Sequence, residues 1–111
     1  MSANVWVKSG KTYNLLDAKT TTGAGTSIFK DAPITTFQAS GTTSAGAGTG
    51  VINIEVSNDN TNWLVLGTIS LTLSTTSSSD GFVANAPWKY VRANVTTLSG
   101  TGASINALIG V

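Results

Sequence analysis

Two residue types that carry much of the chemistry of proteins near neutral pH are missing, because the 111 residues contain no cysteine and no histidine. Without cysteine the chain has no disulfide, no thiolate nucleophile and no thiolate metal site. Without histidine it lacks the side chain that changes charge near pH 7 and the commonest zinc ligand. Most hydrolytic mechanisms are thereby excluded, and we expect neither a metal nor a cofactor.

Charge is scarce as well. Charged residues make up 10% of the chain, against about 25% in an average globular protein. The net charge is +1 and the six basic residues are scattered, whereas capture of nucleic acid needs several clustered cations facing phosphates. We therefore expect no direct contact with nucleic acid. Copies of a protein with so few charges repel one another only weakly, which suits a protein that packs beside copies of itself or on a larger particle.

Long apolar runs are also absent. No stretch approaches the roughly 20 residues of a membrane-spanning helix, so no membrane partner is expected. Residues 1–6 lack the basic region and apolar run of a secretory signal. We expect the protein to be made in the cytoplasm and to stay there unless another structure carries it out.

Nothing in the sequence indicates an enzyme. The acidic residues never form a close pair of the kind used in acid and base catalysis, and the many hydroxyl groups have no histidine to activate them. Three glycine-rich runs neither open a helix nor carry the lysine and serine of a phosphate-binding loop. The acidic residues are Asp17, Asp31, Glu55, Asp59 and Asp80.

The residues that are present predict an all-β fold. Apolar residues recur at every second position in windows rich in Thr, Val, Ile and Gly, most clearly at Ile69, Leu71 and Leu73. A chain of this length can bury one hydrophobic core without disulfides or a bound metal, so we expect one antiparallel two-sheet β-sandwich spanning residues 1–111. The expected strands are residues 5–8, 11–18, 34–39, 51–57, 63–66, 69–73, 81–84, 90–95 and 103–109.

A polar turn that ends in a tryptophan occupies residues 57–63, with the sequence SNDNTNW. Ile52, Ile54 and Val56 alternate with polar residues before it, which is the period of a strand with one buried face. Asn and Asp tolerate positive φ and hydrogen-bond their own backbone, so they can reverse the chain into a hairpin. The same oxygens could bind calcium, but the run lacks the several carboxylates of a tight loop, and turn chemistry is favoured.

Three connections rich in Gly, Ser and Thr are expected to be loops, at residues 20–27, 40–50 and 74–80. They cannot bury enough apolar surface to order themselves, so they should be mobile in water and become ordered against a partner. Together with an N-terminal arm they would supply adaptable contacts.

The aromatic residues are the candidate interface positions. Trp63 and Trp88 each begin a strand, where a large side chain can cap the open end of a sandwich core. The alternative is that they anchor a partner, as Trp, Tyr and Arg often do at the centres of interfaces. Tyr90 and Arg92 fit this second role better, because they share the face of their strand that is opposite the apolar one. Trp6 could reach a neighbour from the N-terminal strand.

The turn SNDNTNW and the later strand WKYVRANV (residues 88–95) together resemble the pattern "S-N-D-G-x-x-W … Y-V-R-x-x-V" of small structural proteins of tailed phages. They also resemble discoidin-type, galactose-binding-like jelly rolls. The similarity covers residues 50–110, about half of the chain, with Asn60 where Gly is usual. Within this group the compact, weakly charged chain is most similar to head-decoration proteins, also called cement or staple proteins, such as that of a short-tailed Salmonella-type phage.

This resemblance implies a jelly-roll-like sandwich on the outer surface of the virion, added to the capsid after synthesis in the host cytoplasm. The protein would staple neighbouring major capsid subunits so that the shell resists the pressure of internal DNA. A homodimer is expected, with a trimer as the alternative. Two other functions are open: a carbohydrate-binding module with a glycan ligand, and a component of the phage tail or baseplate.

Overall fold

The computed structural model describes residues 11–111, so the predicted strand 5–8, the N-terminal arm and Trp6 lie outside the described residues. Within residues 11–111 the chain is all-β and no segment is helical, as the sequence predicts. The strands are β1 (Thr12–Lys19), β2 (Gly23–Ala24), β3 (Ile28–Phe29), β4 (Ile34–Thr42), β5 (Ala45–Ser57), β6 (Leu64–Leu73), β7 (Ser78–Asn85), β8 (Tyr90–Thr101) and β9 (Ser104–Gly110).

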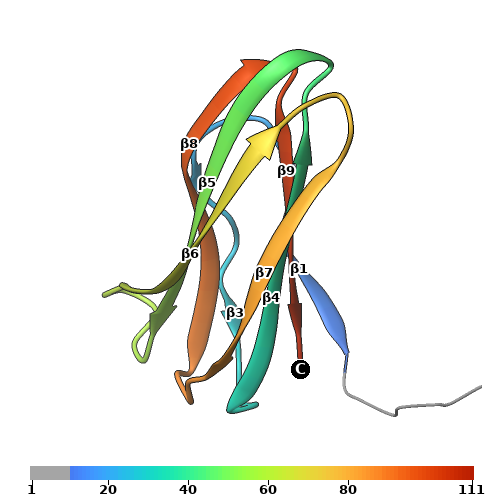
Figure 1. Cartoon of the computed structure of the whole chain (residues 1–111). Helices are drawn as coiled ribbons and strands as arrows, with labels where there is room; N and C mark the ends of the chain where they lie inside the picture. Colours follow the sequence, from blue (N-terminus) through green and yellow to red (C-terminus); the bar gives the residue numbers. More distant parts are fainter. Residues whose placement is uncertain (1–10) are drawn as a thin grey trace, which may run out of the picture.

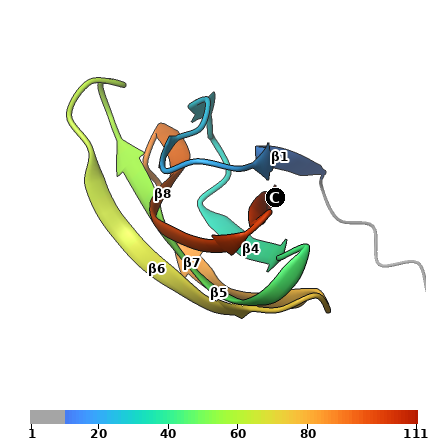
Figure 2. The same cartoon turned by 90° about the horizontal axis from the view of Figure 1, so that it is seen from above.

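The strands form two antiparallel sheets packed face to face. One sheet has the order β1-β9-β4-β7 and the other has the order β2-β8-β5-β6, with β3 also paired to β8. Figure 1 shows the two layers side by side, and Figure 2 shows β6 and β1 at opposite sides of the molecule. The predicted two-sheet sandwich is therefore confirmed. The chain changes sheet at most connections, an alternation that is compatible with the jelly-roll-like prediction.

The core lies between the sheets and is built from the alternating positions of each strand. Every second residue of β9 is buried, and so is every second residue in the second half of β6 and the first half of β8. Cβ atoms point to opposite faces of a strand in turn, so this pattern leaves one apolar face per strand. The largest fully buried apolar side chains are Phe37, Ile52, Ile54, Ile69, Leu73, Ile105 and Ile109.

Residues 40–50, expected as a loop, are instead the end of β4 and the first half of β5, joined by a short turn. The small residues here allow close packing. A Cβ atom on Gly50 would lie 2.7 Å from Cδ1 of Ile105, and one on Gly48 would overlap the carbonyl oxygen of Ser99. Gly41, Gly48 and Gly50 are therefore placed where the chain is tightly packed, whereas Gly46 in the turn has open space around it.

Two smaller differences from the prediction concern strand ends. The predicted strands 63–66 and 69–73 are one strand, β6, which passes Gly67 beneath the ring of Phe82. Next to Gly67 the register of β5 and β6 shifts, because Ile54 pairs with Gly67 and Glu55 pairs with Val65. The predicted loops 20–27 and 74–80 contain β2 and the start of β7, so each is shorter than expected.

Candidate interaction surface

The outer face of the β2-β8-β5-β6 sheet carries a group of aromatic and polar side chains. Register places Glu55 of β5 opposite Arg92 of β8, and Ser57 opposite Tyr90. Their neighbours in sequence, among them Val56 and Val91, point into the core, so these side chains point away from it. We call this group the outer-face cluster, and its members are Phe29, Glu55, Trp63, Tyr90, Arg92 and Asn94.

An ion pair lies at the centre of the outer-face cluster. Nε of Arg92 donates a hydrogen bond to Oε1 of Glu55 at 2.7 Å, and Nδ2 of Asn94 donates to Oε2 at 3.2 Å. Both carboxylate oxygens of Glu55, which is only 8% exposed, are therefore paired. The Arg92 guanidinium lies 4.3 Å from the ring centroid of Trp63, within the range of a cation–π contact.

A second aromatic contact extends the cluster toward β3. The rings of Phe29 and Tyr90 meet edge to face, with centroids 5.7 Å apart and planes at 79°. Phe29 is 64% exposed although its ring contacts Tyr90, so most of this large apolar side chain is available to a partner. The sequence analysis did not identify Phe29, because a two-residue strand shows no alternation.

The polar turn holds Trp63 beside Arg92. The Ser57 hydroxyl accepts hydrogen bonds from the backbone N–H groups of Asp59 and Asn60, at 3.1 and 3.0 Å. The Asp59 carboxylate in turn accepts from the backbone N–H groups of Asn62 and Thr61, and these bonds hold the pKa of Asp59 well below its usual range. Asn60 takes the left-handed conformation, with φ of 60°. Turn chemistry therefore accounts for this run.

The predicted interface residues do not all come together. Trp63, Tyr90 and Arg92 share the outer-face cluster, whereas Trp88 is partly buried and packs against the hydrophobic core. Trp88 thus occupies the capping position that the sequence offered as its other interpretation. Trp6 lies outside the described residues.

Two further observations concern the described part of the chain. Residues 11–111 contain no group of three or more His, Cys, Asp or Glu side chains placed to hold a metal ion. They also contain no helix that is long and apolar enough to cross a membrane.

The fold and the outer-face cluster together define an all-β sandwich with one aromatic sheet face. No family model matches the chain, and no curated protein matches it. Among solved structures, the SPBc2 prophage-derived protein YomS is similar, with a TM-score of 0.61 and 13% identity over 98% of both chains. The PBSX exported protein XepA is similar over 91% of this chain and 36% of its own length, with a TM-score of 0.51 and 15% identity. At these identities the likeness establishes the fold.

Proposed function

We propose that the chain is a non-enzymatic structural protein of a tailed-phage virion. In this proposal the outer-face cluster binds the outer surface of the capsid, and each bound copy joins neighbouring major capsid subunits. The observation that carries it is the convergence of Trp63, Tyr90 and Arg92 with the exposed Phe29 on one sheet face. Trp, Tyr and Arg are the residue types enriched in the energetic centres of protein interfaces.

The structural neighbours support a phage origin. YomS is a prophage-derived protein, and its fold matches that of this chain over nearly its whole length. The scarcity of charge adds to this, because weak self-repulsion allows many copies to sit close together on a lattice.

Binding in many copies would strengthen individually modest contacts. When a copy contacts both the capsid and a neighbouring copy, the first contact raises the effective concentration at which the second contact forms. We expect a homodimer, the commonest closed assembly, or a trimer at a threefold position of the shell.

A carbohydrate-binding module is the second candidate, and one observation favours it. No single loop of the sequence offers an aromatic platform beside acids and amides, but the fold assembles these groups from β3, β5 and β8. In the outer-face cluster the exposed ring of Phe29 meets the ring of Tyr90 edge to face, and an aromatic surface of this kind suits a sugar ring, although the Glu55 carboxylate is already bonded to Arg92 and Asn94. A tail or baseplate position remains the third candidate.

The test uses phage heads and phage tails that have been purified from a phage lacking this protein. Phe29→Ser and Val65→Ser remove exposed apolar groups from the outer face, since Val65 lies opposite Glu55 and is 56% exposed. Val83→Ser is the matched control, because Val83 is 66% exposed on the outer face of the other sheet, opposite Thr36. Co-sedimentation with heads should saturate for the parent and the control, and weaken about tenfold or more for the other two.

Four outcomes contradict capsid binding through this face. Equal binding by all four proteins, or loss with Val83→Ser alone, would place the contact elsewhere. Binding to tails but not to heads would favour the tail component. Binding to a glycan array that Phe29→Ser abolishes, without binding to heads, would favour the carbohydrate-binding module.

A further inference from the structure

β6 ends its sheet, and no other strand among residues 11–111 pairs with its second edge. It has ten residues, none of them charged and none of them proline. Its pairing with β5 is regular from Gly67 to Leu73. A long, uncharged and regular edge of this kind is a template on which another strand can pair.

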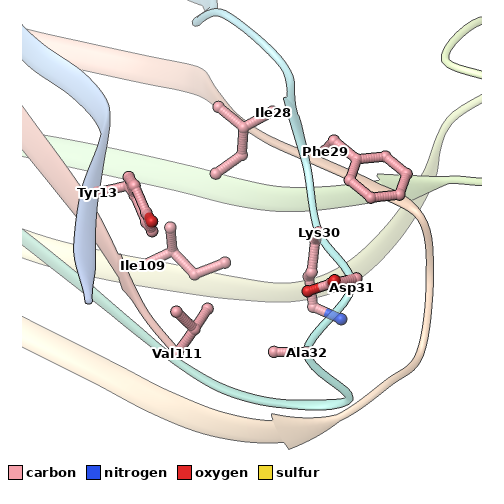
Figure 3. Close-up of a pocket in the computed structure, with 8 residues that line it drawn as sticks. All are labelled: Tyr13, Ile28, Phe29, Lys30, Asp31, Ala32, Ile109 and Val111. Carbon is pink, nitrogen blue, oxygen red and sulfur yellow. The ribbon is translucent and has the colours of Figure 1, made fainter. Parts of the chain in front are cut away.

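The other strands that end a sheet in residues 11–111 carry features that discourage such pairing. β1 contains two register shifts and the charged residues Asp17 and Lys19, and β7 contains Asp80. β2 and β3 are only two residues long. Figure 3 shows Tyr13 of β1 and Ile28 of β3 on either side of a cavity of about 340 Å³, which separates these two edges. Short strands, charges and irregular pairing all hinder edge-to-edge association, so β6 is the least protected of the described edges.

Hydrogen bonds of β5 show how the backbone groups of this sheet are directed. The N–H of Thr49 accepts no carbonyl but donates to Oγ of Ser99 at 3.2 Å, and the carbonyl of Val51 accepts from Oγ1 of Thr96 at 3.3 Å. Thr49 and Val51 therefore turn their backbone groups toward β8. Because successive residues of a strand alternate in this respect, Ile52 turns its N–H and C=O toward β6.

The same alternation defines what the open edge of β6 presents. Ile69 lies opposite Ile52, so its N–H and C=O point back to β5. Thr68, Ser70 and Thr72 alternate with the residues that face β5, and they turn their N–H and C=O groups toward the open edge. Their side chains are exposed on the outer face of the sheet, whereas the apolar residues between them are buried.

We propose that two copies of the chain form a dimer in which β6 pairs antiparallel with β6 of the second copy, about a twofold axis at Ser70. Ser70 then lies opposite Ser70 of the second copy, and Thr68 lies opposite Thr72. All of these residues direct their backbone groups to the open edge, so each pair can exchange two hydrogen bonds. On the buried face, Ile69 of one copy lies opposite Leu71 of the other.

A second copy is favoured over an unrelated strand because β6 is complementary to itself. A twofold axis places the residues of β6 opposite residues of the same strand, so charged residues there would bring like charges close together. β6 carries no charge. In this register it pairs hydroxyl residues with hydroxyl residues, which is a favourable cross-strand combination, and apolar residues with apolar residues.

The pairing places the two outer-face clusters on the same side of one continuous sheet. The twofold axis that relates two antiparallel strands is perpendicular to their sheet, so the outer face of each copy stays outward. One dimer would then present two copies of the cluster to one surface, as joining neighbouring capsid subunits requires. This consequence rests on the proposed function, whereas the dimer itself does not.

Sedimentation equilibrium of the protein alone tests the pairing with variants at Ser70. The parent should be a dimer that dissociates on dilution. Ser70→Lys and Ser70→Glu each place like charges opposite one another across the axis, so each should weaken dimerisation about tenfold or more. An equal mixture of the two should recover the dimer, because lysine then lies opposite glutamate. Ser79→Lys is the matched control, since Ser79 is an exposed residue of β7 at the edge of the other sheet, and it should dimerise like the parent.

Amide hydrogen exchange of the same samples locates the contact. The N–H groups of Thr68, Ser70 and Thr72 should be protected in the dimer and should lose protection on dilution, while the Ile69 amide, directed to β5, changes little. In Ser70→Lys the amides of Thr68 and Thr72 should exchange faster than in the parent at the same concentration.

Several results would overturn the β6 pairing. They are a parent chain that stays monomeric, a dimer that both Ser70 variants leave intact, and a mixture of the two variants that does not recover the dimer. Protection of the Ser70 amide in a monomer would show that the edge is covered from within the chain, and it would overturn the pairing as well. None of these measurements uses phage heads, so the dimer can fail while capsid binding holds, and capsid binding can fail while the dimer holds.

Discussion

Replacing Arg92 with methionine tests whether the outer-face cluster stabilises the fold as well as offering a surface. Methionine keeps an unbranched apolar side chain against the ring of Trp63 but removes the cation and its N–H donors. The Glu55 carboxylate is then left with Asn94 as its hydrogen-bond donor in the cluster. Because Glu55 is almost fully buried, water replaces the lost partner poorly.

The expected cost follows from the two contacts that are lost. A hydrogen bond to a charged group contributes about 1.5–3 kcal/mol, and a cation–π contact near a surface contributes about 0.5–1 kcal/mol. The Arg92 side chain is 27% exposed, so the loss should stay below the 3–5 kcal/mol of a fully buried pair. We expect about 2 kcal/mol, which lowers Tm by on the order of 10 °C in a domain of this size.

Thermal and urea unfolding of the parent, Arg92→Met, Glu55→Gln and the double variant measure this effect. The double variant should be more stable than the sum of the two single changes predicts, with a coupling energy of about 1 kcal/mol or more. A fall in Tm of less than about 2 °C for Arg92→Met, or additive single changes, would contradict a stabilising role for the pair.

Two further predictions concern the tight strand and the turn. Gly48→Ala should destabilise the fold by about 1–3 kcal/mol, because the new Cβ would overlap the Ser99 carbonyl oxygen. Urea unfolding checks this, with Ala47→Ser at an exposed position as the control. Equal stabilities of the two variants would contradict the prediction. The Asp59 carboxylate has a pKa held below its ordinary 3.8, so the stability it adds is present above that value and is lost as the pH falls toward the folded pKa. Asp59→Asn should therefore show a shallower loss of stability between about pH 4 and pH 2 than the parent, and parallel pH profiles in urea would contradict this.

Strands with one apolar and one polar face were predictable from the sequence. In residues 51–57, 69–73 and 103–109 alternation identifies the apolar side chains that the structure places in the core, although Glu55 and Ser57 on the opposite face of β5 are buried as well. The hairpin at the polar turn was predictable for a related reason. Ser57 and Asp59 bond to backbone groups within three residues of themselves, so the turn depends on local chemistry.

Features that depend on contacts between distant residues were not predictable. The first half of β5 is a strand because its glycines fit against β8 and Ile105, and nothing within that segment reveals its neighbours. The pairing of Arg92 with Glu55 requires the register of β5 and β8. Tyr90 and Arg92 could be assigned to one face from alternation, but Phe29 joins them only through the short β3 pairing.

The position of β9 constrains how the protein can fold. β9 lies between β1 and β4 in the sheet, so the earliest described strand acquires its partner from nearly the last residues of the chain. Contacts of such long sequence separation are slow to form, and this sheet cannot be completed until β9 has been synthesised. Until β9 is made, β4 can pair only with β7 and β1 has no partner among the described strands of its sheet, so β9 is the strand that joins β1 to the rest of the sheet.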